Sequence, residues 1–170
     1  MKLLILNGGS CSGKSSVIKY IMKKREHLFH LSYDSLKWSF SNYSSDKYYK
    51  DVQKIVLAVA STVFKMNYDV ISDSTLYNSS RKKLINLATL AGYQILEINL
   101  EASREILIKR FDERVASALA TPEKRISNFS KDRFQELLDI FEREKNLQAI
   151  SIRTDNQSIE DVAESILKIF

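Results

Sequence analysis

Long apolar runs and cysteines are almost absent from this chain of 170 residues. No stretch approaches the roughly 18 consecutive apolar residues of a membrane-spanning helix, so no membrane association is expected. Near the start only residues 3–6 are continuously apolar, whereas the core of a signal peptide needs about 7 residues or more. The single cysteine, Cys11, cannot form an internal disulfide, which favours a reducing compartment and hence a cytoplasmic location.

Proline and glycine are also scarce, and their positions are informative. There is one proline, Pro122, and three of the four glycines, Gly8, Gly9 and Gly13, fall close together near the start. No internal repeat or low-complexity tract is visible, and this length suits one domain. We therefore predict a single domain over residues 1–170, with its glycines concentrated in one local feature.

The clustered glycines form a phosphate-binding motif. Gly8, four residues, Gly13, Lys14 and Ser15 match G-x-x-x-x-G-K-S between an apolar β-rich run and an apolar-periodic helix. In such a loop backbone N–H groups point at phosphate oxygens, the lysine reaches the β- and γ-phosphates, and the serine hydroxyl binds Mg²⁺. We therefore predict that the loop binds ATP and Mg²⁺. The predicted cofactor-binding residues are Gly8, Gly9, Ser10, Cys11, Ser12, Gly13, Lys14, Ser15 and Ser16.

Strand and helix patterns alternate along the whole chain. Strands are predicted at residues 2–7, 28–32, 69–72, 93–100 and 149–153. Helical periodicity is visible at residues 14–25, 47–66, 79–91, 102–115, 131–146 and 158–169. This alternation predicts an α/β fold of the P-loop NTPase type, three layers α/β/α around a five-stranded parallel sheet, with ligands at the carboxyl ends of the strands.

Several classes of P-loop protein are disfavoured. No Asn-Lys-x-Asp is present and no Asp lies three residues before Gly92, so a GTPase switch lacks its elements. Asp73 is followed by Ser74, so the Asp-Glu pair expected of a motor-type ATPase is absent. Phosphoryl transfer to a bound acceptor remains, which predicts a kinase.

Four segments together resemble the small P-loop kinases that include polynucleotide kinase, zeta-toxin kinases and chloramphenicol phosphotransferase. These are LILNGGSCSGKSS at 4–16, HLSYDSLKWSF at 30–40, VISDSTLYNSSRKK at 70–83 and EILIKRFDERV at 105–115. The resemblance covers almost the whole chain. It implies ATP- and Mg²⁺-dependent transfer of the γ-phosphate to a hydroxyl group: a 5′-hydroxyl polynucleotide, a nucleoside or a small molecule.

The resemblance also implies roles for individual residues. Lys14 and Asp34 are predicted to be catalytic, Asp34 as the general base, and Ser15 and Asp73 are the predicted metal ligands. Asp34 could equally be the N-cap of a following helix, where aspartate is common. Arg110 and Arg114, four residues apart on one predicted helix face, would clamp the transferring phosphoryl group. They could instead form salt bridges with Glu105 or Glu113.

The acceptor side is less defined. The predicted acceptor-binding residues are Lys37, Asp73 and Thr75, and Lys37 departs from the arginine usual in polynucleotide kinases. Six aromatic residues crowd positions 33–49, where they could stack on an acceptor or simply pack together. Residues 116–130, around Pro122, lack periodicity and could form a lid over the nucleotide or an ordinary connector.

Charge leaves two rival functions open. Residues 1–60 carry ten Lys or Arg and four Asp or Glu, whereas the rest carries sixteen and seventeen. A basic first third suits a polyanionic substrate, although the basic residues 23–25 would also suit a helix C-terminus. A nucleic acid therefore stays open as a partner. The alternatives to a kinase are an ATP-sensing binding module without transfer and a nucleic-acid-binding protein.

Overall fold

The computed structural model describes residues 1–73, 78–119 and 130–170. Its five strands are β1 (Lys2–Gly8), β2 (Leu28–Leu31), β3 (Asp69–Ser72), β4 (Gln94–Glu101) and β5 (Ile150–Arg153). They form one parallel sheet in the order β2-β3-β1-β4-β5. The helices in the described ranges are α1 (Lys14–Lys24), α2 (Tyr33–Lys37), α3 (Ser45–Lys65), α4 (Asn78–Leu90), α5 (Arg104–Leu119), α6 (Lys131–Glu144) and α7 (Ile159–Leu167).

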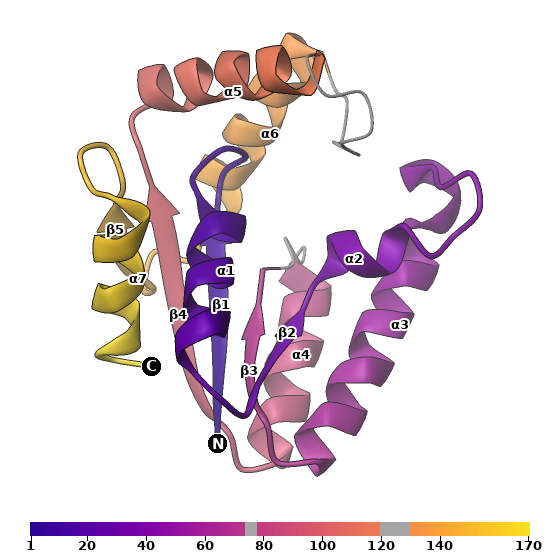
Figure 1. Ribbon diagram of the computed structural model, residues 1–170. Coiled ribbons are helices and arrows are strands. Elements are labelled where there is room, and N and C mark those ends of the chain that lie inside the picture. The colour runs from indigo at the N-terminus through magenta and orange to yellow at the C-terminus, as the bar shows by residue number, and fades with distance from the viewer. Residues whose placement is uncertain (74–77, 120–129) are drawn as a thin grey trace.

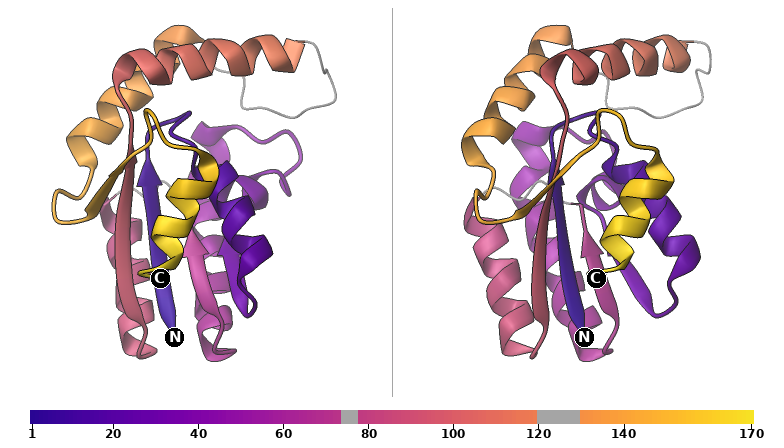
Figure 2. Two further views of the ribbon diagram at one scale, coloured as in Figure 1. Left: turned by 60° about the vertical axis from the view of Figure 1, so that its left-hand side comes forward. Right: turned by 90° about the vertical axis from the view of Figure 1, so that its left-hand side faces the viewer.

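Helices cover both faces of this sheet, so the predicted three-layer α/β/α fold of P-loop NTPases is confirmed. Helices α1 and α7 pack on one face, and α3 and α4 lie on the other (Figures 1 and 2). The central strand β1 is almost continuously buried, as expected for a parallel strand covered on both sides. Helix α2 is an addition that the sequence patterns did not predict, because five residues are too few to display a helical period.

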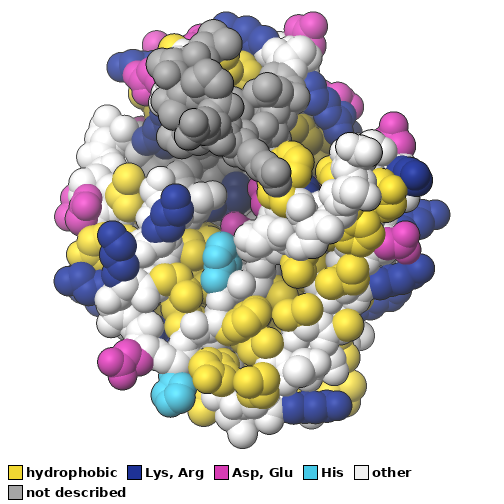
Figure 3. All heavy atoms as spheres, turned by 45° about the vertical axis from the view of Figure 1, so that its right-hand side comes forward, with side chains coloured by type: hydrophobic (Ala, Val, Ile, Leu, Met, Phe, Trp, Pro, Cys, Tyr) yellow, Lys and Arg dark blue, Asp and Glu magenta, His cyan; other side chains and the backbone are white. Residues whose placement is uncertain are grey.

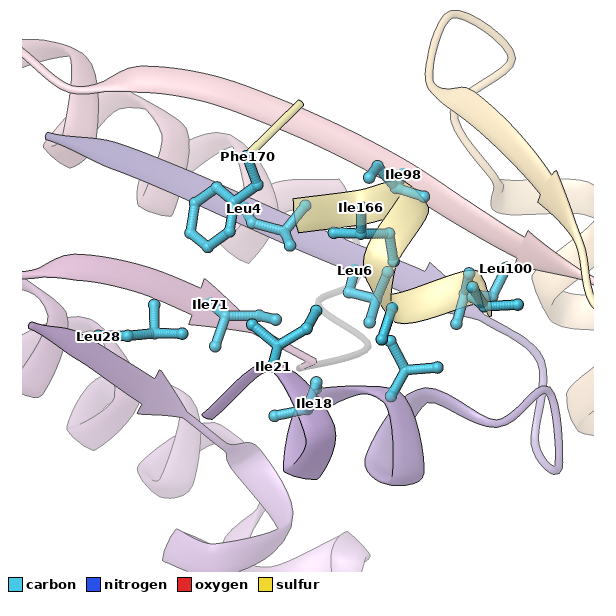
Figure 4. Packing of buried hydrophobic residues seen from close by; sticks show 13 residues of the cluster. Leu4, Leu6, Ile18, Ile21, Leu28, Ile71, Ile98, Leu100, Ile166 and Phe170 are labelled. Carbon is cyan, nitrogen blue, oxygen red and sulfur yellow. The ribbon is translucent and has the colours of Figure 1, made fainter. Parts of the chain in front are cut away.

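Two hydrophobic clusters hold the layers together. On the α1 and α7 face, Leu4 and Leu6 of β1 meet Ile18 and Ile21 of α1, with Ile166 closing the cluster from α7 (Figure 4). Each of these side chains is at most 1% exposed, so its burial contributes roughly 1.5–3 kcal/mol. On the other face, α3 buries residues spaced three or four apart, the stripe of an amphipathic helix. The residues of that stripe are Val52, Val56, Ala60 and Val63.

Helix α5 lies beyond the carboxyl ends of the strands, and α6 packs against it (Figures 1 and 2). Helix α5 crosses above the loop that follows β1, as both views show (Figures 1 and 2). The two helices are held to each other by Phe111 and Phe134, whose rings stack with centroids 4.3 Å apart. Of the predicted lid at residues 116–130, positions 120–129 lie outside the described residues. None of the described helices is both long and apolar enough to span a membrane.

The structure shows how two groups of residues with open roles are packed. The aromatics between residues 33 and 49 pack mainly on one another and on the core, as in the Phe40–Tyr48 and Tyr33–Tyr49 ring pairs at 5.0 and 5.7 Å. The basic residues Lys23 and Lys24 occupy the last turn of α1, at the far end of an 11-residue helix from the P-loop. A helix of that length spans about 16 Å, and cations at its C-terminus interact favourably with its dipole.

Candidate active site

The loop between β1 and α1 has the tight backbone that a phosphate cradle requires. Gly13, the N-cap of α1, has a φ of 97°, a left-handed conformation that favours glycine. A Cβ at Gly8 would come within 2.8 Å of the Leu100 carbonyl oxygen, and one at Gly9 within 2.9 Å of Leu138 on α6. At Gly8 the neighbour is backbone and cannot move, so glycine is needed there, whereas at Gly9 the Leu138 side chain would have to shift.

Lys14 folds back over this loop. Its ammonium Nζ donates hydrogen bonds to the carbonyl oxygens of Gly8 at 2.6 Å and Gly9 at 3.0 Å. Burial lowers the pKa of Lys14, and the nearby negative charges of Asp73 and Asp34 partly oppose that shift, while the charge of Arg114 adds to it. The charges of Asp73, Asp34 and Arg114 thus all act on Lys14, and an anionic phosphate would stabilise its charged form.

Asp73 follows β3 directly, because β3 ends at Ser72. Its side chain is 13% exposed, and its carboxylate Oδ2 lies 3.3 Å from Nε2 of His30 on β2. The neighbouring strands β2 and β3 are in parallel register, with Leu31 opposite Ser72, so their carboxyl ends bring the two side chains together. The structure thus places Asp73 on the same edge of the sheet as the P-loop.

Asp34 lies in the first turn of α2, but it is not the cap of that helix. The N-cap is Ser32, whose hydroxyl accepts a hydrogen bond from the Ser35 backbone N–H. The capping alternative for Asp34 is therefore wrong: Ser32 and Asp34, two positions apart, are both of types that favour caps, and Ser32 takes the position. The Asp34 side chain is 71% exposed, and its Oδ1 accepts a 2.6 Å hydrogen bond from Lys37.

Lys37 itself is unusual for a lysine, since it is 8% exposed. Its ammonium lies 4.9 Å from the centre of the Trp38 ring and 5.9 Å from that of Tyr43, in cation–π contact with both. The aromatic cluster and Asp34 thus hold Lys37 in one place. Thr75, predicted beside it in the acceptor site, lies outside the described residues.

The two predicted arginines of α5 differ in their contacts. Arg110 donates from Nη1 to the Thr154 hydroxyl at 3.0 Å and from Nη2 to the Thr154 carbonyl at 2.6 Å. Thr154 follows β5 and donates to the Ser12 carbonyl at 3.4 Å, so Arg110 is connected to the P-loop. Arg114 is exposed and acts on the charge of Lys14. Neither arginine is ion-paired with Glu105 or Glu113, so the salt-bridge alternative is wrong.

A second contact fixes the base of α5. The Asp155 carboxylate accepts from the Ser103 backbone N–H at 2.7 Å, and hydrogen bonding to Ser103 lowers the pKa of Asp155 to about 2. Ser158 caps α7. Thr154 and Asp155 are not among the site residues named from the sequence, although Thr154 directly follows the last strand, at the edge where ligands are expected.

The residues at this edge suit Mg²⁺ better than a softer metal. In the described part of the chain, no three His, Cys, Asp or Glu side chains gather into a metal cluster. A Mg²⁺ ion beside a nucleotide needs only one or two protein oxygens, because phosphates and water supply the rest of its shell. The carboxylate of Asp73 and the hydroxyl of Ser15, the second residue of α1, are such oxygens and fit this role.

Comparisons with known proteins agree with this arrangement. A parallel sheet with a P-loop between its central strand and the following helix defines a P-loop protein with the kinase type of fold. The family model of Zeta toxin matches residues 2–165, so this chain belongs to the zeta toxin family.

Solved structures show the same fold. The APS kinase CysC of Mycobacterium tuberculosis, in complex with AMPPNP and APS, is 16% identical over 99% of this chain and 96% of that one, with a TM-score of 0.64. A gluconokinase from Sinorhizobium meliloti 1021 is 20% identical over 98% and 90%, with a TM-score of 0.65. A chain of the Pnkp1/Rnl/Hen1 RNA repair complex is 23% identical over 85% and 45%, with a TM-score of 0.68.

Proposed function

We propose that this chain is an ATP- and Mg²⁺-dependent kinase that transfers the γ-phosphate of ATP to a hydroxyl group of an acceptor. The observation that carries the proposal is that Asp73, directly after β3, lies on the same sheet edge as the P-loop, and that Arg110 of α5 is linked to that loop through Thr154. The charges of Asp73, Asp34 and Arg114 also act on the ammonium of Lys14. A module that only anchors ATP would need the P-loop but not a carboxylate from α2 beside it.

In this mechanism the P-loop and Lys14 bind the β- and γ-phosphates, and Ser15 and Asp73 hold the Mg²⁺ ion that neutralises phosphate charge. The acceptor hydroxyl loses its proton to Asp34 as its oxygen bonds to the γ-phosphorus. The bond between that phosphorus and the β,γ-bridging oxygen breaks, and ADP leaves. Arg110 and Arg114 stabilise charge on the transferring phosphoryl oxygens.

Lys37 orients the base in this proposal. Because it donates to Oδ1 of Asp34, the second carboxylate oxygen remains available to an acceptor hydroxyl. An acceptor bound at Asp34 would also lie near the ammonium of Lys37, which would attract an anionic group of that acceptor. Asp73 and Thr75 complete the proposed acceptor contacts.

The test is transfer of labelled phosphate from γ-labelled ATP to a panel of acceptors. Suitable acceptors are 5′-hydroxyl oligonucleotides, nucleosides, gluconate, adenylylsulfate and amino-alcohol antibiotics. Labelled product with at least one class, abolished by EDTA, supports the kinase. ATP binding without any labelled product would favour the ATP-sensing module, and salt-sensitive nucleic-acid binding that needs no ATP would favour the nucleic-acid-binding alternative.

A further inference from the structure

His30 has a contact that the proposed phosphoryl transfer leaves unexplained. It is one of two histidines in the chain and lies on the edge strand β2, which pairs only with β3 in the sheet. Its Nε2 atom is buried and lies 3.3 Å from Asp73 Oδ2. Within the described ranges this nitrogen makes no hydrogen bond, so the Asp73 carboxylate is the polar group that it faces.

The position of Asp73 makes this contact relevant to the site. Of the carboxylates whose charge raises the pKa of Lys14, Asp73 has the largest effect, and the same carboxylate lies 3.3 Å from the His30 ring nitrogen. Figure 3 shows one face of the molecule, on which a histidine side chain reaches the surface near the centre of the view. His30 also adds little to the core, since its side chain is 28% exposed.

We propose that His30 is a positioning residue for Asp73. When a nucleotide is bound, the imidazole Nε2–H, which lies 3.3 Å from Oδ2 without a hydrogen bond in this structure, donates to it and fixes the rotation of the carboxylate, so that its other oxygen is available to the Mg²⁺ shell. Groups that orient a metal-binding carboxylate in this way raise metal affinity without touching the metal. The inference rests on the proposed function, because that proposal assigns Asp73 to Mg²⁺.

The experiment measures ATP binding by calorimetry, once with excess Mg²⁺ and once in EDTA. If His30 positions Asp73, His30→Ala should weaken Mg²⁺-dependent ATP binding by about 10–100-fold. Binding in EDTA should stay at the wild-type level, because the P-loop contacts do not involve His30. His30→Gln, which retains a donor, should recover part of the loss.

His27 provides a matched control. It lies just before the opposite end of β2 and is exposed, and its ring makes an edge-on contact with Tyr68 with the centroids 5.3 Å apart. Because its φ of 54° is left-handed, the suitable change is His27→Asn, since asparagine tolerates that conformation. This variant should bind ATP like the wild type in both conditions.

Three results would overturn the inference: wild-type ATP binding that ignores Mg²⁺, His30→Ala binding like the wild type, or an equal loss with Mg²⁺ and in EDTA, which would show a structural role. If His30→Ala does not fold, the Mg²⁺ dependence of His30→Gln decides the question in the same way. Failure of the proposed function is a separate outcome. In that case the wild type transfers no phosphate to any acceptor, while the Mg²⁺-specific loss in His30→Ala still stands.

Discussion

The P-loop and helix α2 contribute to one candidate site but are built in opposite ways. The P-loop is made of backbone atoms confined by neighbours, with Gly8 and Gly9 both buried. Helix α2 has five residues and presents a side chain, Asp34, that is 71% exposed and held by a single lysine. A phosphate site depends on backbone geometry that glycine dictates, whereas the acceptor side depends on side chains that can change without altering the fold.

This contrast predicts that donor-side substitutions affect every acceptor alike. Lys14→Ala removes the cation on the β- and γ-phosphates. The rate of transfer should therefore fall by about 10³-fold, the largest effect usual for removing one group that stabilises charge in the transition state. The variant should still fold. Burial lowers the pKa of Lys14, so below that pKa the charged side chain decreases the free energy of unfolding, and its removal does not destabilise the protein. Steady-state transfer and thermal unfolding at pH 7 check both statements. Near-normal transfer would remove the P-loop from the proposed mechanism.

Three arginines of helix α5 allow catalytic and structural effects to be compared within one helix. Arg114→Ala removes charge near Lys14 but no hydrogen bond to a described residue, so kcat should fall by about 10²-fold with unchanged stability. Arg110→Ala should lower both kcat and the midpoint of thermal unfolding, because it also removes the two hydrogen bonds from Arg110 to Thr154. Arg104→Ala is the control, since Arg104 is on the same helix and pairs with Asp139 at the surface. Equal effects of all three changes would contradict the assignment of α5.

The smallest effect is expected from the two serine caps. Ser32→Ala and Ser158→Ala each remove a side-chain cap, of α2 and α7 respectively, and each should cost about 1 kcal/mol of helix stability. Only Ser32→Ala should also lower kcat, because only α2 carries Asp34. Denaturant unfolding and transfer rates measured on both variants test this. A loss of kcat in Ser158→Ala of the same size would show that the effect is general destabilisation.

Much of the fold was predictable because its signals are local. The P-loop motif and the apolar strand before it fix the start of the sheet, and strand 69–72 was located with its observed ends. Helix α2 was missed because it is too short for periodicity. Its cap was misassigned because Ser32 and Asp34 favour the same position and only the backbone decides between them.

The contacts between elements could not be predicted from a single sequence. The spacing of Arg110 and Arg114 predicts that they lie on one helix face. It does not predict the hydrogen bond from Arg110 to Thr154. His30 and Asp73 are 43 positions apart in the sequence, and only the strand register brings them together.

The most direct test of the central claim is the kcat of Asp34→Asn with an identified acceptor, measured beside its affinity for Mg²⁺·ATP. Asparagine keeps the shape but cannot accept the proton, so kcat should fall by roughly 10²–10⁴-fold while ATP affinity is unchanged. Asp46→Asn, in the first turn of α3, is the matched control and should behave like the wild type. A kcat for Asp34→Asn within about threefold of the wild type would contradict the account.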